Sequence, residues 1–421
     1  MISFSIQNFG CRVNQAEAFS WAEEFQDRGL RLEEDLSRSQ VIVVNTCTLT
    51  GRADRDVRKF IRRVAQLNPG ARVVVTGCSV ERSRREFADN PLVWRVFSNT
   101  EKKDLPAEVI ALVGEEGEAR ILPFRSRALL KIQDGCNCRC AFCVIPSVRG
   151  RSESSPQEEI LDRLRRFISR GFREIVLAGI HLSSYGLDLQ PRSSLLGLLR
   201  EVEKLEGLGR VRMSSLDPRF MDENLMGFLA GSPKVCPHFH LSLQHGSDRI
   251  LALMGRKSTT REYAWILDSL RRGSRDAALG ADIMVGFPEE TEEDFRETYR
   301  FLNASPLDYF HVFSYSPRPG TEAASRKPVD AKEAKERSAV LRKLSKEKQT
   351  AFRRRFIGRE LDGIVIDNED GRTEVLTPNY IPAWADGPPP PEGSEVRVKI
   401  TGVSASAVSG DIMTFPHGGR P

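Results

Sequence analysis

Short apolar runs alternate with amphipathic stretches over the first quarter of the chain. Runs of β-branched residues at 41–44 and 73–75 predict buried strands, and the mixed segment at 15–27 has the 3.6-residue period of a helix. Alternation of this kind is typical of a parallel α/β domain. We therefore predict an α/β fold here, with strands at 2–7, 41–44 and 73–75 and helices at 15–27 and about 53–66.

Longer strand–helix units follow between about residue 125 and residue 316. Six units of this length indicate an open, partial (βα)6 barrel. In such barrels the chemistry lies at the carboxyl ends of the strands. The expected strands are 128–133, 174–178, 211–213, 238–243, 281–285 and 309–313, and the expected helices are 157–170, 194–205, 222–230, 261–271 and 292–303.

The pattern changes twice in the last hundred residues. A helix with the apolar stripe Leu341, Leu344 and Phe352 is predicted first, and residues 322–360 carry 13 Lys and Arg against 6 Asp and Glu. That charge fits either a solvated helix face or contact with a phosphate backbone. Short alternating strands at 363–367, 373–376, 395–400 and 412–415 then predict a small all-β barrel. The expected domains are therefore 1–120, 121–321, 322–357 and 358–421.

Composition narrows the class of protein. The chain has 421 residues, of which 40% are hydrophobic and 29% charged, so two or three well-cored domains are expected. No apolar run approaches the roughly 20 residues of a membrane span, and the N-terminus has no basic and apolar leader. Eight clustered cysteines in such a chain favour metal ligation over disulfides. We expect a cytoplasmic protein with no membrane contact.

Four cysteines lie in one loop directly after the strand predicted at 128–133. Cys136, Cys140 and Cys143 have C-x3-C-x2-C spacing. Three thiolates this close suit a soft metal centre and leave one metal position open to a substrate or cofactor. A structural zinc site is the alternative, and it needs a fourth ligand, for which Cys138 is the candidate. The open centre is favoured because structural zinc prefers paired cysteines.

A second group of cysteines follows the strands of the first domain. Cys11, Cys47 and Cys78 stand in the segments GCRVN, NTCT and TGCS, each just after a predicted strand. Parallel strands end at the same edge of a sheet, so the three thiols should converge on a second metal site. The alternative is three separate buried cysteines. We interpret the remaining Cys236 as structural.

Small and polar residues follow several barrel strands, where a ligand can approach the backbone. Ordinary loop polarity is the alternative at each of them. His245 is interpreted as a hydrogen-bonding residue of the pocket, with proton transfer as the alternative, and His181, His238, His240 and His311 as mostly packed side chains. The candidate ligand-binding residues are Gly179, Ser214, Ser215, Ser242, Gln244 and Gly286.

The cysteine loop CNCRCAFCVIPSVRG resembles the radical S-adenosylmethionine (AdoMet) enzymes, and in particular their methylthiotransferase branch. The three N-terminal cysteine motifs match the first domain of that branch. The resemblance implies that Cys136, Cys140 and Cys143 hold a [4Fe-4S] cluster whose fourth iron binds AdoMet, with Phe142 against the adenine. It implies an auxiliary [4Fe-4S] cluster on Cys11, Cys47 and Cys78. The strand-end residues named above correspond to segments that contact AdoMet or the target nucleoside.

The segment GCRVN is similar to the members that act on threonylcarbamoyladenosine in tRNA. The implied reaction is methylthiolation of C2 of N6-threonylcarbamoyladenosine at position 37. The alternatives are isopentenyladenosine in tRNA, an aspartate of a ribosomal protein, a metal-stabilised RNA-binding protein without activity, and electron transfer alone. The implied partners are the tRNA anticodon stem-loop and an external electron donor such as a flavodoxin or ferredoxin.

The C-terminal domain resembles a TRAM domain, the RNA-binding barrel that closes this family. Residues 361–421 nevertheless carry 4 Lys and Arg against 9 Asp and Glu. Non-specific electrostatic capture of RNA by this domain is therefore not expected. Recognition would depend on local contacts from Arg372, Tyr380, Arg397 and Lys399, and the basic helix before the domain would supply more of the attraction.

Overall fold

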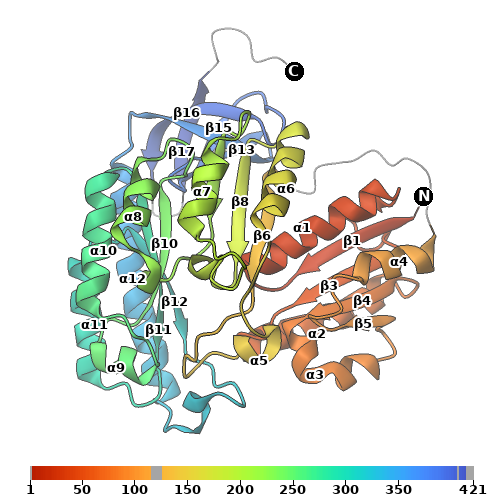
Figure 1. Cartoon of the computed structure of the whole chain (residues 1–421), viewed down its shortest axis with the longest axis horizontal. Coiled ribbons are helices and arrows are strands. Elements are labelled where there is room, and N and C mark those ends of the chain that lie inside the picture. Colours follow the sequence, from red (N-terminus) through yellow and green to blue (C-terminus); the bar gives the residue numbers. More distant parts are fainter. Residues whose placement is uncertain (1, 115–125, 405–406, 414–421) are drawn as a thin grey trace.

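The computed structural model describes residues 2–114, 126–404 and 407–413, which form three bodies in contact (Figure 1). The expected α/β fold is confirmed, with parallel sheets in the first two bodies and a closed all-β barrel in the third. The boundary expected between residues 120 and 121 lies outside the described residues.

A five-stranded parallel sheet in the order β2-β1-β3-β4-β5 forms the N-terminal domain. Its central strands are continuous apolar runs because helices cover both faces of the sheet. The short strands β2 and β5 and the helices α3 and α4 were not predicted. The strands are β1 (Ser3–Asn8), β2 (Arg31–Leu32), β3 (Val41–Thr46), β4 (Arg72–Gly77) and β5 (Arg95–Phe97), and the helices are α1 (Arg12–Asp27), α2 (Gly51–Leu67), α3 (Cys78–Ala88) and α4 (Leu105–Val113).

Six parallel strands form the open barrel of the second body. Two sheets, in the orders β7-β6-β8-β9 and β10-β11-β12, are joined by the bridges Val211 to Val235 and Leu216 to Leu241. The expected (βα)6 arrangement is thus confirmed. Its strands are β6 (Ala128–Asp134), β8 (Glu174–Gly179), β9 (Arg210–Met213), β10 (His238–Gln244), β11 (Ala278–Val285) and β12 (Tyr309–Ser314), with β7 (Glu153–Ser154) on the edge.

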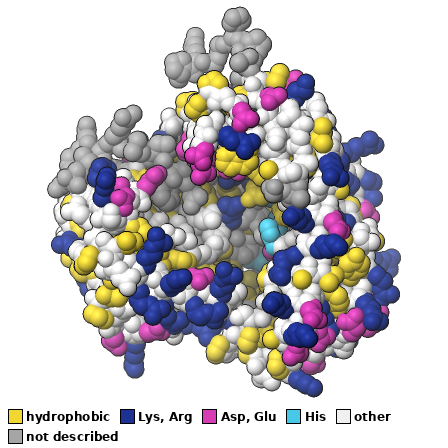
Figure 2. All heavy atoms as spheres, turned by 180° about the vertical axis from the view of Figure 1, so that it is seen from behind, with side chains coloured by type: hydrophobic (Ala, Val, Ile, Leu, Met, Phe, Trp, Pro, Cys, Tyr) yellow, Lys and Arg dark blue, Asp and Glu magenta, His cyan; other side chains and the backbone are white. Residues whose placement is uncertain are grey.

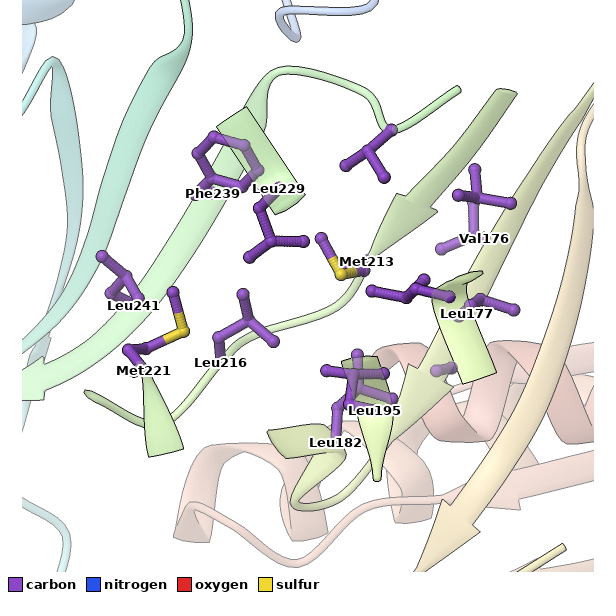
Figure 3. Packing of buried hydrophobic residues seen from close by; sticks show 14 of the residues in the cluster. Val176, Leu177, Leu182, Leu195, Met213, Leu216, Met221, Leu229, Phe239 and Leu241 are labelled. Carbon is purple, nitrogen blue, oxygen red and sulfur yellow. The ribbon is translucent and has the colours of Figure 1, made fainter. Parts of the chain in front are cut away.

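Amphipathic helices cover the outside of the barrel and close its core. In Figure 3, Met213 of β9 lies between Leu177 of β8 and Leu229 of a covering helix, and Phe239 of β10 lies on the far side of Leu229. Leu195, from another covering helix, lies below Met213. These side chains are almost fully buried. The helices are α6 (Gln157–Ser169), α7 (Leu195–Glu203), α8 (Glu223–Gly231), α10 (Thr260–Gly273) and α11 (Glu292–Ala304), with the short helices α5 (Ile145–Arg149) and α9 (Asp248–Leu253) in loops.

A 24-residue helix and a closed five-stranded barrel end the chain. Helix α12 (Ala331–Arg354) buries the expected stripe of Leu341, Leu344 and Phe352. Strand β15 begins with a proline and was not predicted, and the strand expected at 412–415 lies at Val408–Met413 instead, with residues 414 and 415 outside the described part of the chain. The barrel strands are β13 (Glu360–Glu369), β14 (Arg372–Leu376), β15 (Pro382–Asp386), β16 (Glu395–Val403) and β17 (Val408–Met413).

The three bodies are joined by shared packing and not only by the chain. Helix α1 contributes Phe19 to the core of the middle barrel, whereas its Trp21 and Phe25 belong to the core of the N-terminal domain. At the opposite side of the junction, Tyr380 of the C-terminal barrel stacks on His238 with ring centroids 4.2 Å apart. The N-terminal domain reaches the same tyrosine, because Arg12 donates a hydrogen bond to its hydroxyl over 2.8 Å.

Candidate active site

The cysteine loop leaves the carboxyl end of β6 through a turn that only glycine allows. Gly135 has φ +63°, and a Cβ there would lie 1.9 Å from the carbonyl oxygen of Arg151. The backbone of the loop is held from both sides, since Cys136 N–H donates to the Gly150 carbonyl over 3.1 Å and Ala141 N–H donates to the Met254 carbonyl over 2.9 Å. These hydrogen bonds tie the loop to two neighbouring segments of the barrel.

The thiols of Cys136, Cys140 and Cys143 are half-buried together in this loop. Burial raises the pKa of Cys143 to about 11 and also raises the pKa of Cys140, against the opposing charge of Arg256. The pKa of Cys136 is raised by its contact with Cys138 and by burial. Such thiols stay protonated at neutral pH and lose their protons when a metal binds. Three soft donors in one fixed loop fit a [4Fe-4S] cluster with one open iron.

The fourth cysteine of the loop has different neighbours. Arg219 donates a hydrogen bond to the Cys138 sulfur over 3.0 Å, and the Nε2 atom of His181 lies 3.8 Å from it. Asp217 holds both of these neighbours through its carboxylate. No three Cys, His, Asp or Glu side chains within residues 2–114, 126–404 and 407–413 surround a point as the ligands of one metal ion do. The contacts of its sulfur with Arg219 and His181 distinguish Cys138 from the other three cysteines of the loop.

The structure brings Cys11, Cys47 and Cys78 together at the carboxyl edge of the N-terminal sheet. They follow β1, β3 and β4, which are adjacent and parallel. Gly77 has φ +103°, and a Cβ there would lie 2.4 Å from the Thr46 carbonyl oxygen, so glycine is needed for the turn into α3. Burial raises the pKa of Cys11 and raises that of Cys47 to about 12. This triad also offers three soft donors and fits a second cluster.

One arginine from the middle barrel enters the N-terminal triad. The Nε atom of Arg149 donates to the Cys78 sulfur over 3.2 Å, and its Nη atoms donate to Asn14, Glu17 and Asp134 over 2.8, 3.0 and 2.9 Å. Burial opposes the charge of Arg149, but Glu17 and the facing thiols raise its pKa well above the ordinary value. Sequence analysis missed this residue, although it lies in the quoted run VIPSVRG.

Residues of both triads contact one apolar cluster. Cys78 is buried with Val144, Ile145 and Val148, and Cys136 and Cys143 pack against the same residues. Helix α5 supplies Ile145 and Val148 and ends at Arg149. The two triads therefore meet at this short helix.

The strand-end residues fall into two groups. Gly179, Ser214, Ser242 and Gln244 lie at the ends of β8, β9 and β10. The Gly179 N–H donates to the Ser214 hydroxyl over 3.3 Å, and the Ser242 hydroxyl donates to the Leu216 carbonyl over 3.2 Å. Gln244 has φ +80°, and its buried Oε1 has no hydrogen-bond partner among the described residues. A polar ligand at the mouth of the barrel would satisfy that atom.

The other candidates differ in surroundings. Ser215 is exposed, and Phe142 packs on the cluster of Met284 and Phe287 at the end of β11. The absent side chain of Gly286 faces α12, because a Cβ there would lie 2.7 Å from the Cβ of Ala334. Helix packing is therefore sufficient to explain this glycine.

The histidines have several different environments. His245 is fully buried, and its Nδ1 accepts from the Ser247 N–H over 3.1 Å, while its Nε2 lies 3.7 Å from Glu290. It is a packed, hydrogen-bonding side chain. His238 and His240 are also buried, and the more exposed His311 stacks on His240 with ring centroids 5.2 Å apart. Seen from behind, a histidine is visible in a deep hollow flanked by Lys and Arg side chains (Figure 2).

Comparison with known proteins agrees with this architecture. Residues 130–302 match the radical SAM superfamily, and residues 3–98 match the uncharacterized protein family UPF0004. Among solved structures, the radical AdoMet methyltransferase TsrM from Kitasatospora setae shares the fold, with a TM-score of 0.55 at 16% identity over 77% of each chain. The barrel and the three-cysteine loop thus define a radical SAM enzyme, which uses AdoMet and a [4Fe-4S] cluster.

Curated relatives narrow the class. The threonylcarbamoyladenosine tRNA methylthiotransferase MtaB of Aquifex aeolicus (strain VF5) is 38% identical over 91% of this chain and 96% of its own length. MtaB of Bacillus subtilis (strain 168) is 34% identical over 77% and 76%. The tRNA-2-methylthio-N(6)-dimethylallyladenosine synthase of Aquifex aeolicus (strain VF5) is 30% identical over 97% and 98%. The chain belongs to the radical SAM methylthiotransferase family.

Proposed function

We propose that this protein methylthiolates C2 of N6-threonylcarbamoyladenosine at position 37 of tRNA. The observation that carries the proposal is the pair of three-thiol sites that meet at one apolar cluster beside α5, in a chain whose relatives named for this reaction match most of its length. In Aquifex aeolicus the relative named for dimethylallyladenosine is 30% identical and the MtaB relative is 38% identical, which makes dimethylallyladenosine the second candidate.

The two triads divide the reaction between them. In this proposal Cys136, Cys140 and Cys143 hold the cluster that binds AdoMet, and Cys11, Cys47 and Cys78 hold an auxiliary [4Fe-4S] cluster that carries the sulfur. An adenine C2–H bond cannot be ionised by a side chain at neutral pH, and the bound cofactors supply the one-electron chemistry that removes its hydrogen. The chain contributes fixed thiol positions, and the Arg149 cation compensates negative charge beside Cys78.

The mouth of the barrel orients the ligands. Gly179, Ser214, Ser242 and Gln244 lie where AdoMet or the target base would approach, and Phe142 is assigned to the adenine of AdoMet. Ser215 and Gly286 also belong to the proposed ligand-binding residues, but the structure gives them less support. Ser215 is exposed, and Gly286 packs on α12.

The assignment extends to domains and partners. We assign residues 1–120 to the auxiliary cluster domain, 121–321 to the radical SAM domain, 322–357 to a basic helical segment and 358–421 to a TRAM domain. The partners are the tRNA anticodon stem-loop and a flavodoxin-like or ferredoxin-like electron donor, which places the protein in the cytoplasm. Within the described residues no helix has the length and apolar character of a membrane span.

Mass spectrometry of tRNA nucleosides tests the proposed substrate. Cells that lack the gene should lose 2-methylthio-N6-threonylcarbamoyladenosine, the wild-type gene should restore it, and a Cys140→Ala gene should not. The 2-methylthio derivative of isopentenyladenosine is measured in the same samples as the control. Loss of that second nucleoside alone would overturn the substrate assignment in favour of the second candidate.

A further inference from the structure

Helix α2 (Gly51–Leu67) of the N-terminal domain carries a basic face that is separate from α12. At 100° per residue its exposed cations occupy one arc of about 100°. The buried residues Val57, Ile61 and Val64 lie on the opposite side of the helix. The cations of this face are Arg52, Arg55, Lys59, Arg62 and Arg63.

Most of these cations have no internal partner. Arg55, Lys59, Arg62 and Arg63 form no ion pair with any residue that the structure describes, and Arg52 has only an exposed contact with Asp56 at 3.7 Å. The sixth cation of the helix, Arg58, lies outside this face and is paired with Glu86 at 2.5 Å. The positive charge of the face is therefore available to an external anion.

The basic face begins near the carboxyl edge of the N-terminal sheet, where Cys11, Cys47 and Cys78 lie. Helix α2 starts shortly after Cys47, and its first N–H, of Gly51, donates to the Ser316 hydroxyl over 3.3 Å. Arg318 donates to the Thr48 hydroxyl and to Asp54, so the helix start is fixed against the segment that follows β12. From Arg52 to Arg63 the face runs about 16 Å away from that edge. Basic side chains gather beside the hollow in Figure 2.

We propose that this face of α2 binds the sugar–phosphate backbone of the RNA whose base enters the hollow. The inference rests on the proposed function and names the surface that it requires. The face is charged and has few exposed apolar side chains, as a phosphate-binding surface does and a protein-docking surface does not. It also compensates for the acidic C-terminal barrel, where 4 Lys and Arg face 9 Asp and Glu over residues 361–421.

Contacts between side-chain cations and phosphates do not depend on the RNA sequence, and they weaken as the salt concentration rises. Each phosphate that a cation neutralises contributes about 0.7 to 0.9 to the slope of log affinity against log salt concentration. Loss of three such cations should flatten the slope by about 2 and weaken binding about tenfold or more near 100 mM salt. The loss of affinity should be the same for a modified and an unmodified RNA, because the two RNAs have the same phosphate backbone.

The test compares two triple variants of the enzyme loaded with both clusters. The test variant is Arg55→Gln/Lys59→Gln/Arg62→Gln. The control variant is Arg166→Gln/Arg200→Gln/Arg272→Gln, which removes the same charge from exposed positions on α6, α7 and α10. Binding to an anticodon stem-loop RNA, with threonylcarbamoyladenosine or plain adenosine at position 37, is measured over a range of KCl concentrations. Iron content and RNA-independent cleavage of AdoMet check that each protein is intact.

The outcomes separate the two proposals. A flatter slope and weaker binding of both RNAs by the test variant, with the control variant within about twofold of wild type, supports the basic face. If the wild-type enzyme methylthiolates the RNA and the test variant binds it as tightly as wild type does, this inference is overturned and the proposed function stands. The same conclusion follows if the control variant loses as much RNA affinity as the test variant. A wild-type enzyme that neither binds nor modifies the RNA overturns both.

Discussion

The Arg149 guanidinium donates a hydrogen bond to the Cys78 sulfur across 3.2 Å, although the two residues belong to different domains. The same side chain is almost completely buried and pairs with Glu17 at 3.0 Å. If Cys78 holds the proposed auxiliary cluster, this buried cation would favour the more negative state of the cluster, so Arg149 would affect both folding and electron transfer at that site.

Replacement of Arg149 by Met should make the reduction potential of the auxiliary cluster more negative. It should also lower the free energy of unfolding by up to about 3–5 kcal/mol, because Glu17 and Asp134 lose a buried partner. Arg149→Lys keeps the positive charge and should shift the reduction potential less than Arg149→Met does. Redox titration followed by electron paramagnetic resonance measures the effect, and a potential equal to wild type in Arg149→Met would assign the residue a purely structural role.

Cys138 and Cys140 should behave differently when replaced. Cys140→Ala removes a donor of the AdoMet-binding cluster, so about four irons per chain and the formation of 5'-deoxyadenosine should be lost. Cys138→Ser should keep both, because the sulfur of Cys138 contacts Arg219 and His181. Iron analysis and chromatography of the AdoMet products distinguish the two. Equal loss of iron in both variants would show that Cys138 is a ligand.

Glu174 should make the protein sensitive to acid. Burial alone would raise the pKa of this carboxyl, but Arg212, Arg127 and Arg210 lower it from near 4.5 to about 2. Because the pKa is lower in the folded state, the stabilisation is complete above about pH 4.5 and is lost as the pH falls towards 2. Its size is on the order of 3 kcal/mol. Denaturant unfolding at several pH values should show a shallower acid limb in Glu174→Gln than in wild type.

His245→Ser should affect stability and leave the radical step unchanged. The fully buried ring accepts from the Ser247 N–H, so its removal leaves a cavity and an unsatisfied donor at a cost of about 1–3 kcal/mol. The denaturation midpoint should fall, while 5'-deoxyadenosine formation per cluster should stay as in wild type. A loss of that activity at unchanged stability would instead indicate a catalytic role for His245.

Periodicity predicted the fold because the strands and helices that build it are long or strongly apolar. Strand β3 is a continuous buried run, and α12 repeats Leu341 and Leu344 on one face, so local sequence was sufficient. Strand β15 was missed because it has only five residues and begins with a proline, which is typical of a turn. Helix α3 was missed because it starts at Cys78, directly in the turn after β4.

The spacing of cysteines in the sequence located the two thiol triads, but it could not predict contacts between domains. Cys11, Cys47 and Cys78 each follow a strand that periodicity predicted, and Cys136, Cys140 and Cys143 lie close together in one loop of the sequence. The meeting of Arg149 with Cys78 depends on how two bodies pack, and no local pattern encodes it. At Gly286 the sequence suggested a ligand where the fold supplies a packing contact. The glycine lies against Ala334, which is about fifty residues later in the chain, so helix packing explains it.

Helix α5 couples the two cysteine triads mechanically. It begins shortly after Cys143 of the loop and ends at Arg149, whose Nε atom donates to the Cys78 sulfur. Its Val148 and Ile145 pack around Cys78. A displacement of the cysteine loop would therefore also unpack Cys78, so the two triads cannot shift independently of each other.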